Sequence, residues 1–109
     1  NVKEFKDIIH LHLSETIGID KTYQTVDMLH VDLHNEGGIL EKIIPHWIDK
    51  TRLCIVIEGG SSERDQVEWM IKFNKQPIKK WLTAFSRQRS DIDYFTVEPF
   101  PSVTIIRKK

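Results

Sequence analysis

The sequence predicts an open α/β sheet that closes with an antiparallel strand pair. Short apolar stretches alternate along the chain with amphipathic stretches of helical period, which is typical of α/β domains. A continuous apolar run, Leu53 to Ile57, stops at a glycine pair, as a buried strand would. The chain has 109 residues, of which 39% are hydrophobic, so we expect one compact domain and not a disordered chain.

Strands are expected over Ile8–Leu13, Val26–Leu33, Arg52–Glu58, Tyr94–Pro99 and Ser102–Arg107. The first stretch alternates apolar and polar side chains with a period of two, although its apolar residues also fit a helical spacing. The third is apolar at every position between its charged ends, which is typical of a strand covered on both faces. The connection between the last two is too short for a helical crossover, so we expect them to form an antiparallel hairpin.

The stretch Glu36–Ile48 is predicted to form an amphipathic helix, because its isoleucines and Trp47 recur at spacings of three and four. Pro45 lies inside this stretch and predicts a break or kink near His46. Proline lacks the N–H that the helix needs, and its ring clashes with the preceding turn.

Two further helices are expected between the glycine pair and the terminal hairpin. Ser62 and Asp65 are spaced almost as in a capping box, which predicts a helix that starts there and ends at Pro77. The next helix is expected over Ile78–Arg87. The inward-facing positions predicted in these two helices are Val67, Met70, Ile71, Asn74, Trp81, Leu82 and Phe85.

Charge and cysteine content exclude several classes of protein. Sixteen Lys and Arg balance sixteen Asp and Glu, so general electrostatic binding to nucleic acid is not expected. The single cysteine, Cys54, cannot form an internal disulfide, and it lies in an apolar run where we expect it to be a core residue. No apolar run approaches the roughly 18 residues of a membrane helix. We therefore expect a cytoplasmic protein without a membrane partner. Because the sequence opens on Asn1 and not on Met, we also expect a trimmed or partial chain.

Candidate functional residues follow two of the expected strands. Asp32 and His34 come at the end of one, and Glu58 ends another. In open parallel sheets, ligands bind outside the carboxyl ends of the strands. These three side chains are candidates to hold a divalent cation, or to supply a general base. The alternative is that they are solvated loop residues that cap the next helix.

The glycine pair Gly59-Gly60 and the histidines leave weaker signals. The glycines allow a close approach of the backbone to a ligand. Before a helix, they also fit a simple turn and cap, or a helix start that accepts an anion. His10 and His12 share one face of an expected strand and have no nearby partner for zinc. A histidine in a strand is usually a structural residue.

The order of these motifs resembles the latter half of class I S-adenosylmethionine-dependent methyltransferases. The residues that carry the resemblance are Val26-Asp27-Met28-Leu29-His30-Val31-Asp32, followed by a helix and then Leu53-Cys54-Ile55-Val56-Ile57-Glu58-Gly59-Gly60. The segment Glu58 to Met70 looks like a subgroup of bacterial O-methyltransferase-like proteins. The resemblance implies a Rossmann-like sheet, here its C-terminal half, in which the fourth and fifth strands are followed by an antiparallel sixth and seventh strand pair.

The resemblance also implies roles for individual residues. Ser14 and Glu15 match the region that contacts the adenine of S-adenosylmethionine. Asp32 matches the position that flanks the methyl donor, and in metal-dependent members of the family it ligates a divalent ion. Glu58 lies where such members carry a second acidic ligand, although Asp or Asn is more usual there than Glu. His34 has no firm family role, and we consider it as a candidate base.

Two family features are absent from the chain: the glycine-rich cofactor loop and the acidic residue that holds the ribose. We therefore interpret residues 1–109 as one partial methyltransferase-like domain, which by itself would bind the cofactor weakly and be inactive. The first half would be supplied by preceding residues or by strands of a partner copy in a homo-oligomer, unless the first strand pairs differently and gives a smaller sheet.

The leading hypothesis from the sequence is methyl transfer to an oxygen of a small-molecule or glycan hydroxyl acceptor. The alternative is a non-catalytic α/β interaction module derived from the same fold, which an exposed apolar sheet face would favour. A third hypothesis, a phosphate- or nucleotide-binding module, depends on Gly59-Gly60 and nearby lysines and lacks a phosphate-loop motif.

Overall fold

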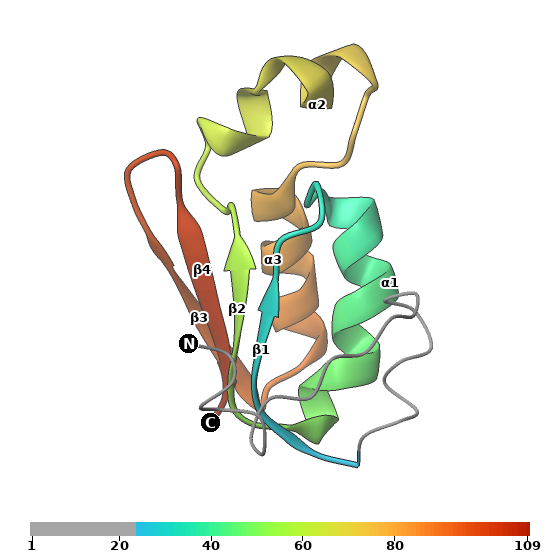
Figure 1. Cartoon of the computed structure of the whole chain (residues 1–109), viewed down its shortest axis with the longest axis vertical. Coiled ribbons are helices and arrows are strands. Elements are labelled where there is room, and N and C mark those ends of the chain that lie inside the picture. The colour runs from blue at the N-terminus through green and yellow to red at the C-terminus, as the bar shows by residue number, and fades with distance from the viewer. Residues whose placement is uncertain (1–23) are drawn as a thin grey trace, which may run out of the picture.

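The computed structural model describes residues 24–109, which form a four-stranded mixed sheet with two longer helices beside it (Figure 1). The strand expected over Ile8–Leu13 and the adenine-contacting candidates Ser14 and Glu15 lie outside the described residues. The elements are β1 (Val26–Val31), α1 (Gly37–Trp47), a 3-10 helix (Ile48–Lys50), β2 (Thr51–Glu58), a second 3-10 helix (Arg64–Gln66), α2 (Glu68–Lys72), α3 (Ile78–Gln88), β3 (Ile92–Val97) and β4 (Val103–Lys108).

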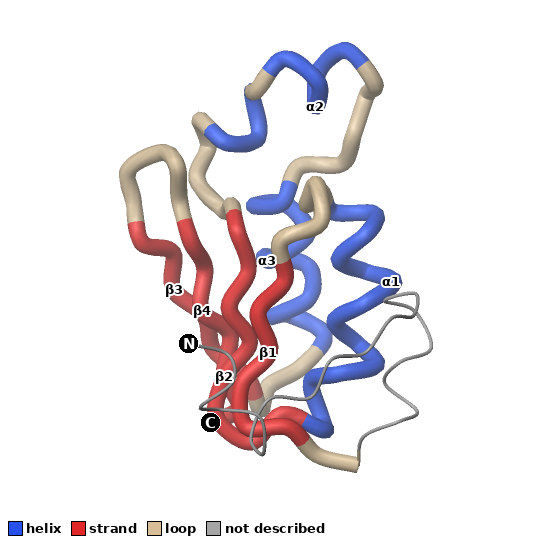
Figure 2. Tube along the Cα trace, viewed as in Figure 1, coloured by secondary structure: helices blue, strands red, loops and turns tan. Residues whose placement is uncertain are grey.

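The sheet has the strand order β1-β2-β4-β3 (Figure 2). β1 and β2 are parallel and are connected through α1, with Val31 opposite Ile57. β4 lies antiparallel between β2 and β3, so that Ile106 is opposite both Ile55 and Tyr94. The predicted α/β sheet and its terminal antiparallel hairpin are therefore confirmed for the described residues.

The core lies between one face of this sheet and helices α1 and α3. Trp81, Leu82 and Phe85 are buried along α3, as the helical spacing predicts, and the Trp81 and Phe85 rings stack with centroids 5.0 Å apart. The other buried apolar residues of this cluster are Val31, Leu40, Ile43, Ile44, Trp47, Ile48, Ile55, Ile57, Ile78, Ile92 and Ile106.

Of the break or kink predicted near His46, the break is wrong, because α1 runs through Pro45 and ends at Trp47. Proline removes one N–H donor from the helix. Because α1 ends two residues after Pro45, few helical hydrogen bonds follow the one that is missing. The next amide, Ile48 N–H, still donates to the Ile44 carbonyl, and both side chains are buried in the core.

The single helix predicted from Ser62 to Pro77 is also wrong. The segment contains a three-residue 3-10 helix and the five-residue α2 instead. Asp65 caps a different helix: its carboxylate accepts hydrogen bonds from Ile78 N–H (2.7 Å) and Lys79 N–H (3.0 Å) at the start of α3. The predicted inward positions of the segment are only partly met, because Met70 is buried whereas Ile71 is 67% exposed.

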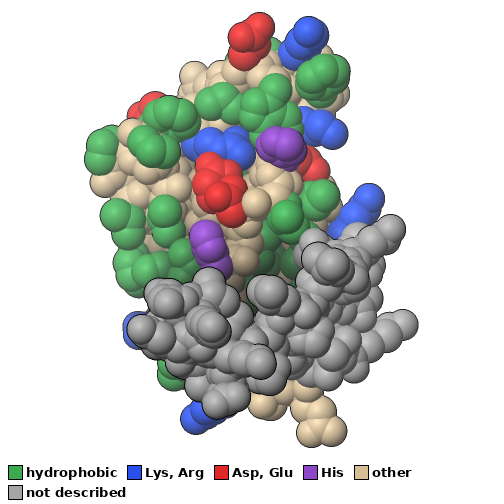
Figure 3. Space-filling view, in the orientation of Figure 1, with side chains coloured by type: hydrophobic (Ala, Val, Ile, Leu, Met, Phe, Trp, Pro, Cys, Tyr) green, Lys and Arg blue, Asp and Glu red, His purple; other side chains and the backbone are tan. Residues whose placement is uncertain are grey.

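The prediction that β2 is covered on both faces is not met within the described residues. Figure 1 shows α1 and α3 on the same side of the sheet. On the opposite side, the strand register places four exposed apolar residues, which we call the outer face: Met28, Phe95, Val97 and Val103. Figure 3 shows hydrophobic side chains gathered over the β3–β4 hairpin.

Ion pairs around Arg89 connect the segments at the amino end of β2. The Arg89 guanidinium contacts Asp49 (2.6 Å) and Asp91 (2.8 Å), and Lys108 lies 3.6 Å from Asp49. Hydrogen bonds from Arg89 hold the pKa values of both carboxyls below their usual range. A carboxyl whose pKa is lower in the folded state stabilises the fold above its unfolded pKa, and this contribution is lost as the pH falls through the folded value.

We predict that Arg89→Met lowers the melting temperature at pH 7 by a few degrees, and that its difference from the unmodified chain shrinks between about pH 5 and about pH 2. Arg87→Met is the matched control, because Arg87 is exposed in the last turn of α3, just before Arg89, and forms no ion pair with another described residue. Thermal unfolding followed by circular dichroism across this pH range measures both variants. If the difference in melting temperature between Arg89→Met and the unmodified chain stayed constant down to about pH 2, the stabilising role of the Arg89 ion pairs would be contradicted.

Candidate functional site

The carboxyl ends of β1 and β2 are held together by the buried side chain of Asn35. Its amide nitrogen donates to the carbonyls of Val31 (2.8 Å) and Glu58 (2.9 Å), and its oxygen accepts from Leu33 N–H (3.1 Å). Because these bonds satisfy backbone groups of both strand ends, Asn35 fixes the edge at which ligands bind in parallel sheets.

Arg64 adds a second connection at the same edge. Its guanidinium binds both carboxylate oxygens of Glu58, with Nε–Oε2 at 2.5 Å and Nη2–Oε1 at 2.9 Å, and Nη2 also donates to the Asn35 carbonyl (2.9 Å). The guanidinium lies over the Trp69 ring, 5.4 Å from its centroid. Arg64 is only 5% exposed, and its Nη1 has no hydrogen-bond partner among the described residues. This bidentate pair fixes the loop after β2 and positions Trp69.

The glycine pair between Glu58 and Arg64 has a structural role. Gly59 and Gly60 have φ values of 102° and 125°, and a Cβ on Gly60 would collide with the hydroxyl of Thr104. Gly59 N–H donates to the Ser102 carbonyl (2.8 Å), and Ser61 N–H donates to the Ser102 hydroxyl (3.0 Å). The close approach predicted for these glycines is therefore to the β3–β4 hairpin, and these two amides are not free to bind a phosphate.

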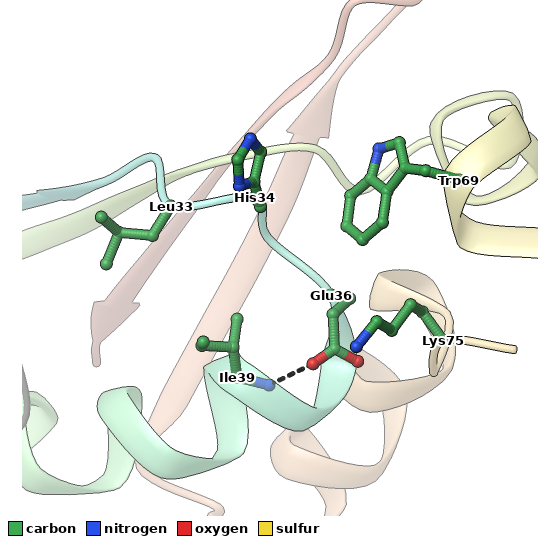
Figure 4. Close-up of a pocket in the computed structure, with 6 residues that line it drawn as sticks. All are labelled: Leu33, His34, Glu36, Ile39, Trp69 and Lys75. Atoms are coloured by element: carbon green, nitrogen blue, oxygen red, sulfur yellow. Dashed lines mark hydrogen bonds between the residues drawn. The ribbon is translucent and has the colours of Figure 1, made fainter. Parts of the chain in front are cut away.

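A pocket of about 480 Å³ opens beside this edge, between the loop after β1 and the segment around α2 (Figure 4). Its lining residues are Leu33, His34, Glu36, Ile39, Trp69 and Lys75. The rings of His34 and Trp69 meet edge to face, with centroids 6.0 Å apart and planes at 64°. His34 has a φ of 49°, a conformation that a non-glycine residue adopts at some cost in free energy.

The three candidates predicted at the strand ends have different surroundings. His34 lines the pocket. Asp32 is exposed and forms no hydrogen bond or ion pair with another described residue. Glu58 has both oxygens bound to Arg64, which neutralises the charge that a metal ion would need. Within residues 24–109, no three His, Cys, Asp or Glu side chains are grouped so that they could hold a metal ion.

Glu36 and Lys75 give the pocket its charged end. The Glu36 carboxylate caps α1 by accepting from Ile39 N–H (2.7 Å) and Gly38 N–H (2.9 Å), and it also accepts from Gln76 N–H (3.3 Å). Lys75 reaches the same end from the segment after α2, as Figure 4 shows. Its side chain forms no hydrogen bond or ion pair with another described residue.

The sequence did not predict an individual role in this site for Asn35, Glu36, Arg64, Trp69 or Lys75. Asn35 and Glu36 stand directly between an expected strand and an expected helix, which is a signal for capping and strand-end contacts. Arg64 and Trp69 carried no such signal, because their pairing with Glu58 and His34 depends on the path of the loop after the glycines.

Comparisons with known proteins find no match for this chain among protein-family models, curated proteins or solved structures. Among the helices of residues 24–109, none has the length and apolar character required to cross a membrane.

We predict that Asn35→Ala lowers the free energy of unfolding by about 3 kcal/mol, because it leaves two carbonyls and one N–H without their partner in a buried setting. Asp32→Ala is the control three residues away, and we expect it to change stability by no more than about 0.5 kcal/mol because Asp32 is exposed and unpaired among the described residues. Urea denaturation measures both variants. Equal stability of the two would show that Asn35 does not hold the strand ends together.

Proposed function

We propose that this chain carries the C-terminal half of an S-adenosylmethionine-dependent methyltransferase domain that transfers a methyl group to a hydroxyl oxygen. The observation that carries the proposal is the arrangement of β1, α1 and β2. The two parallel strands end at one edge, where Asp32 and His34 follow β1 and His34 lines a pocket, and an antiparallel hairpin completes the sheet. This is the order of elements that the sequence resemblance implies.

Methyl transfer requires an in-line approach of acceptor and donor and removal of the acceptor's proton. When bound, S-adenosylmethionine supplies an electrophilic methyl group. The exposed carboxylate of Asp32 is free to accept hydrogen bonds from the donor molecule, and the imidazole of His34 lines the pocket where it could accept the hydroxyl proton.

A divalent cation does not fit the residues of this site. The second acidic ligand implied by the resemblance is Glu58, and its two oxygens are bound by Arg64. The proposal therefore assigns deprotonation of the acceptor to His34 and includes no step through a metal ion.

A non-catalytic interaction module is the second candidate function, and the outer face favours it. Phe95, Val97 and Val103 are neighbours on the β3–β4 hairpin, and Phe95 and Val97 are each more than half exposed. Met28, also more than half exposed, lies on the same face at the opposite edge of the sheet. Contiguous exposed apolar surface is typical of protein interaction sites.

We predict that S-adenosylhomocysteine binds this chain weakly, with a dissociation constant on the order of 1 mM, and shifts the amide resonances of residues 32–34. Asp32→Ala should abolish these shifts. Asp27→Ala should retain them, because Asp27 is an exposed aspartate at the other end of β1 that pairs with Arg52. Titration of the ¹⁵N-labelled chain, followed by NMR, measures binding.

Methyl transfer would be contradicted if the chain is folded but its amide resonances do not shift at several millimolar S-adenosylhomocysteine. Sedimentation equilibrium of the same sample then tests the second candidate. Self-association that Phe95→Ser abolishes would favour an interaction module.

A further inference from the structure

Backbone hydrogen bonds of Lys75 itself and of the following residue, Gln76, hold Lys75 beside the pocket. Its own N–H donates to the Met70 carbonyl (2.8 Å), in a turn that ends α2 with Asn74 at a φ of 50°. This is the bonding pattern that terminates many helices. The next residue, Gln76, accepts from Gly37 N–H (2.7 Å) through its carbonyl. These bonds fix the segment after α2 against the start of α1, and the Lys75 side chain therefore points to the pocket.

The two charged groups at this end of the pocket, Glu36 and Lys75, differ in how far their hydrogen-bonding capacity is used. Glu36 is the one acidic lining residue, and its carboxylate already accepts three backbone N–H groups, two of them at the amino end of α1. A helix amino end carries a partial positive charge that compensates such a carboxylate. The Lys75 ammonium lacks an equivalent compensation, since no hydrogen bond or ion pair joins it to a described residue.

Neighbouring lysines differ from Lys75 in this respect. The Lys72 ammonium lies over the Phe73 ring, 5.6 Å from its centroid, and the Lys79 ammonium bonds to the Ser62 hydroxyl (3.2 Å). Neither of them lines the pocket. Of these three lysines, Lys75 is thus the one that lines this pocket and forms no hydrogen bond or ion pair with a described residue.

The opposite part of the pocket is aromatic and apolar. Trp69 is fixed on one side by the Arg64 guanidinium and meets the edge of His34 on another. Leu33 and Ile39 are the other apolar residues that line the pocket. Two rings that meet at a steep angle form a corner that a flat ring can fill, stacking on one and contacting the other by its edge.

We propose that this pocket binds a small planar ring compound with an anionic substituent. The ring lies in the corner formed by His34 and Trp69, and the anionic group pairs with the Lys75 ammonium. Under the proposed function, on which this part of the inference rests, a ring hydroxyl near His34 would be the methyl acceptor. Binding of the anionic ring itself requires no methyl donor.

The test uses 4-hydroxybenzoate and its neutral analogue 4-hydroxybenzamide, each titrated into the ¹⁵N-labelled chain without a methyl donor. The Trp69 indole N–H reports binding, and the indoles of Trp47 and Trp81 serve as internal references because both are buried in the core. We expect the acid to shift the Trp69 signal with a dissociation constant about tenfold lower than that of the amide, because its pair with Lys75 is charge-assisted.

Lys75→Gln should remove the preference for the acid, whereas the matched control Lys72→Gln should keep it. The spectrum of each variant shows whether it remains folded. The inference is overturned if the acid and the amide bind equally, if neither shifts the Trp69 indole, or if the preference survives in Lys75→Gln. Binding of 4-hydroxybenzoate without any binding of S-adenosylhomocysteine would support the inference and contradict the proposed methyl transfer. Binding of S-adenosylhomocysteine without any binding of 4-hydroxybenzoate would contradict the inference and leave the proposed methyl transfer standing.

Discussion

The site depends on a buried arginine. Arg64 binds both oxygens of Glu58 at the end of β2, and it reaches across to the Asn35 carbonyl after β1. A buried guanidinium is costly to desolvate, so it persists only where most of its donors are paired. The loops after both strands are consequently tied to one group, and the face of that group supports Trp69. The loops that border the pocket and the position of Trp69 follow from this one set of contacts.

Most of the fold could be predicted from the sequence, because it depends on patterns that repeat within an element. The apolar run that ends at Ile57 and the spacing of Trp81, Leu82 and Phe85 correctly gave a strand and a helix. The segment Ser62–Pro77 could not be predicted in the same way. Its Asp65 carboxylate binds amides 13 and 14 residues further along the chain, so the local capping pattern did not describe the real bonds.

The candidate site was predicted less completely than the fold. The rule that ligands bind at the carboxyl ends of parallel strands directed attention to Asp32, His34 and Glu58, of which His34 lines the pocket. It could not show that Glu58 is neutralised by an arginine six residues later. Nor could it place Lys75, whose position depends on the turn after α2 and on bonds to the start of α1. Contacts between loops are set by the tertiary path of the chain, and a single sequence carries little record of them.

The central claim is that the Glu58–Arg64 pair orders the site, and NMR of Glu58→Gln tests it most directly. This change keeps the shape of the side chain and removes its charge. In the unmodified chain we expect an Arg64 Nε–H signal that is protected from exchange with solvent, unlike that of the exposed Arg52. In Glu58→Gln this protection should be lost, and the Trp69 indole and His34 resonances should shift while those of β3 stay in place. A protected Arg64 signal and an unmoved Trp69 indole in the variant would contradict the claim.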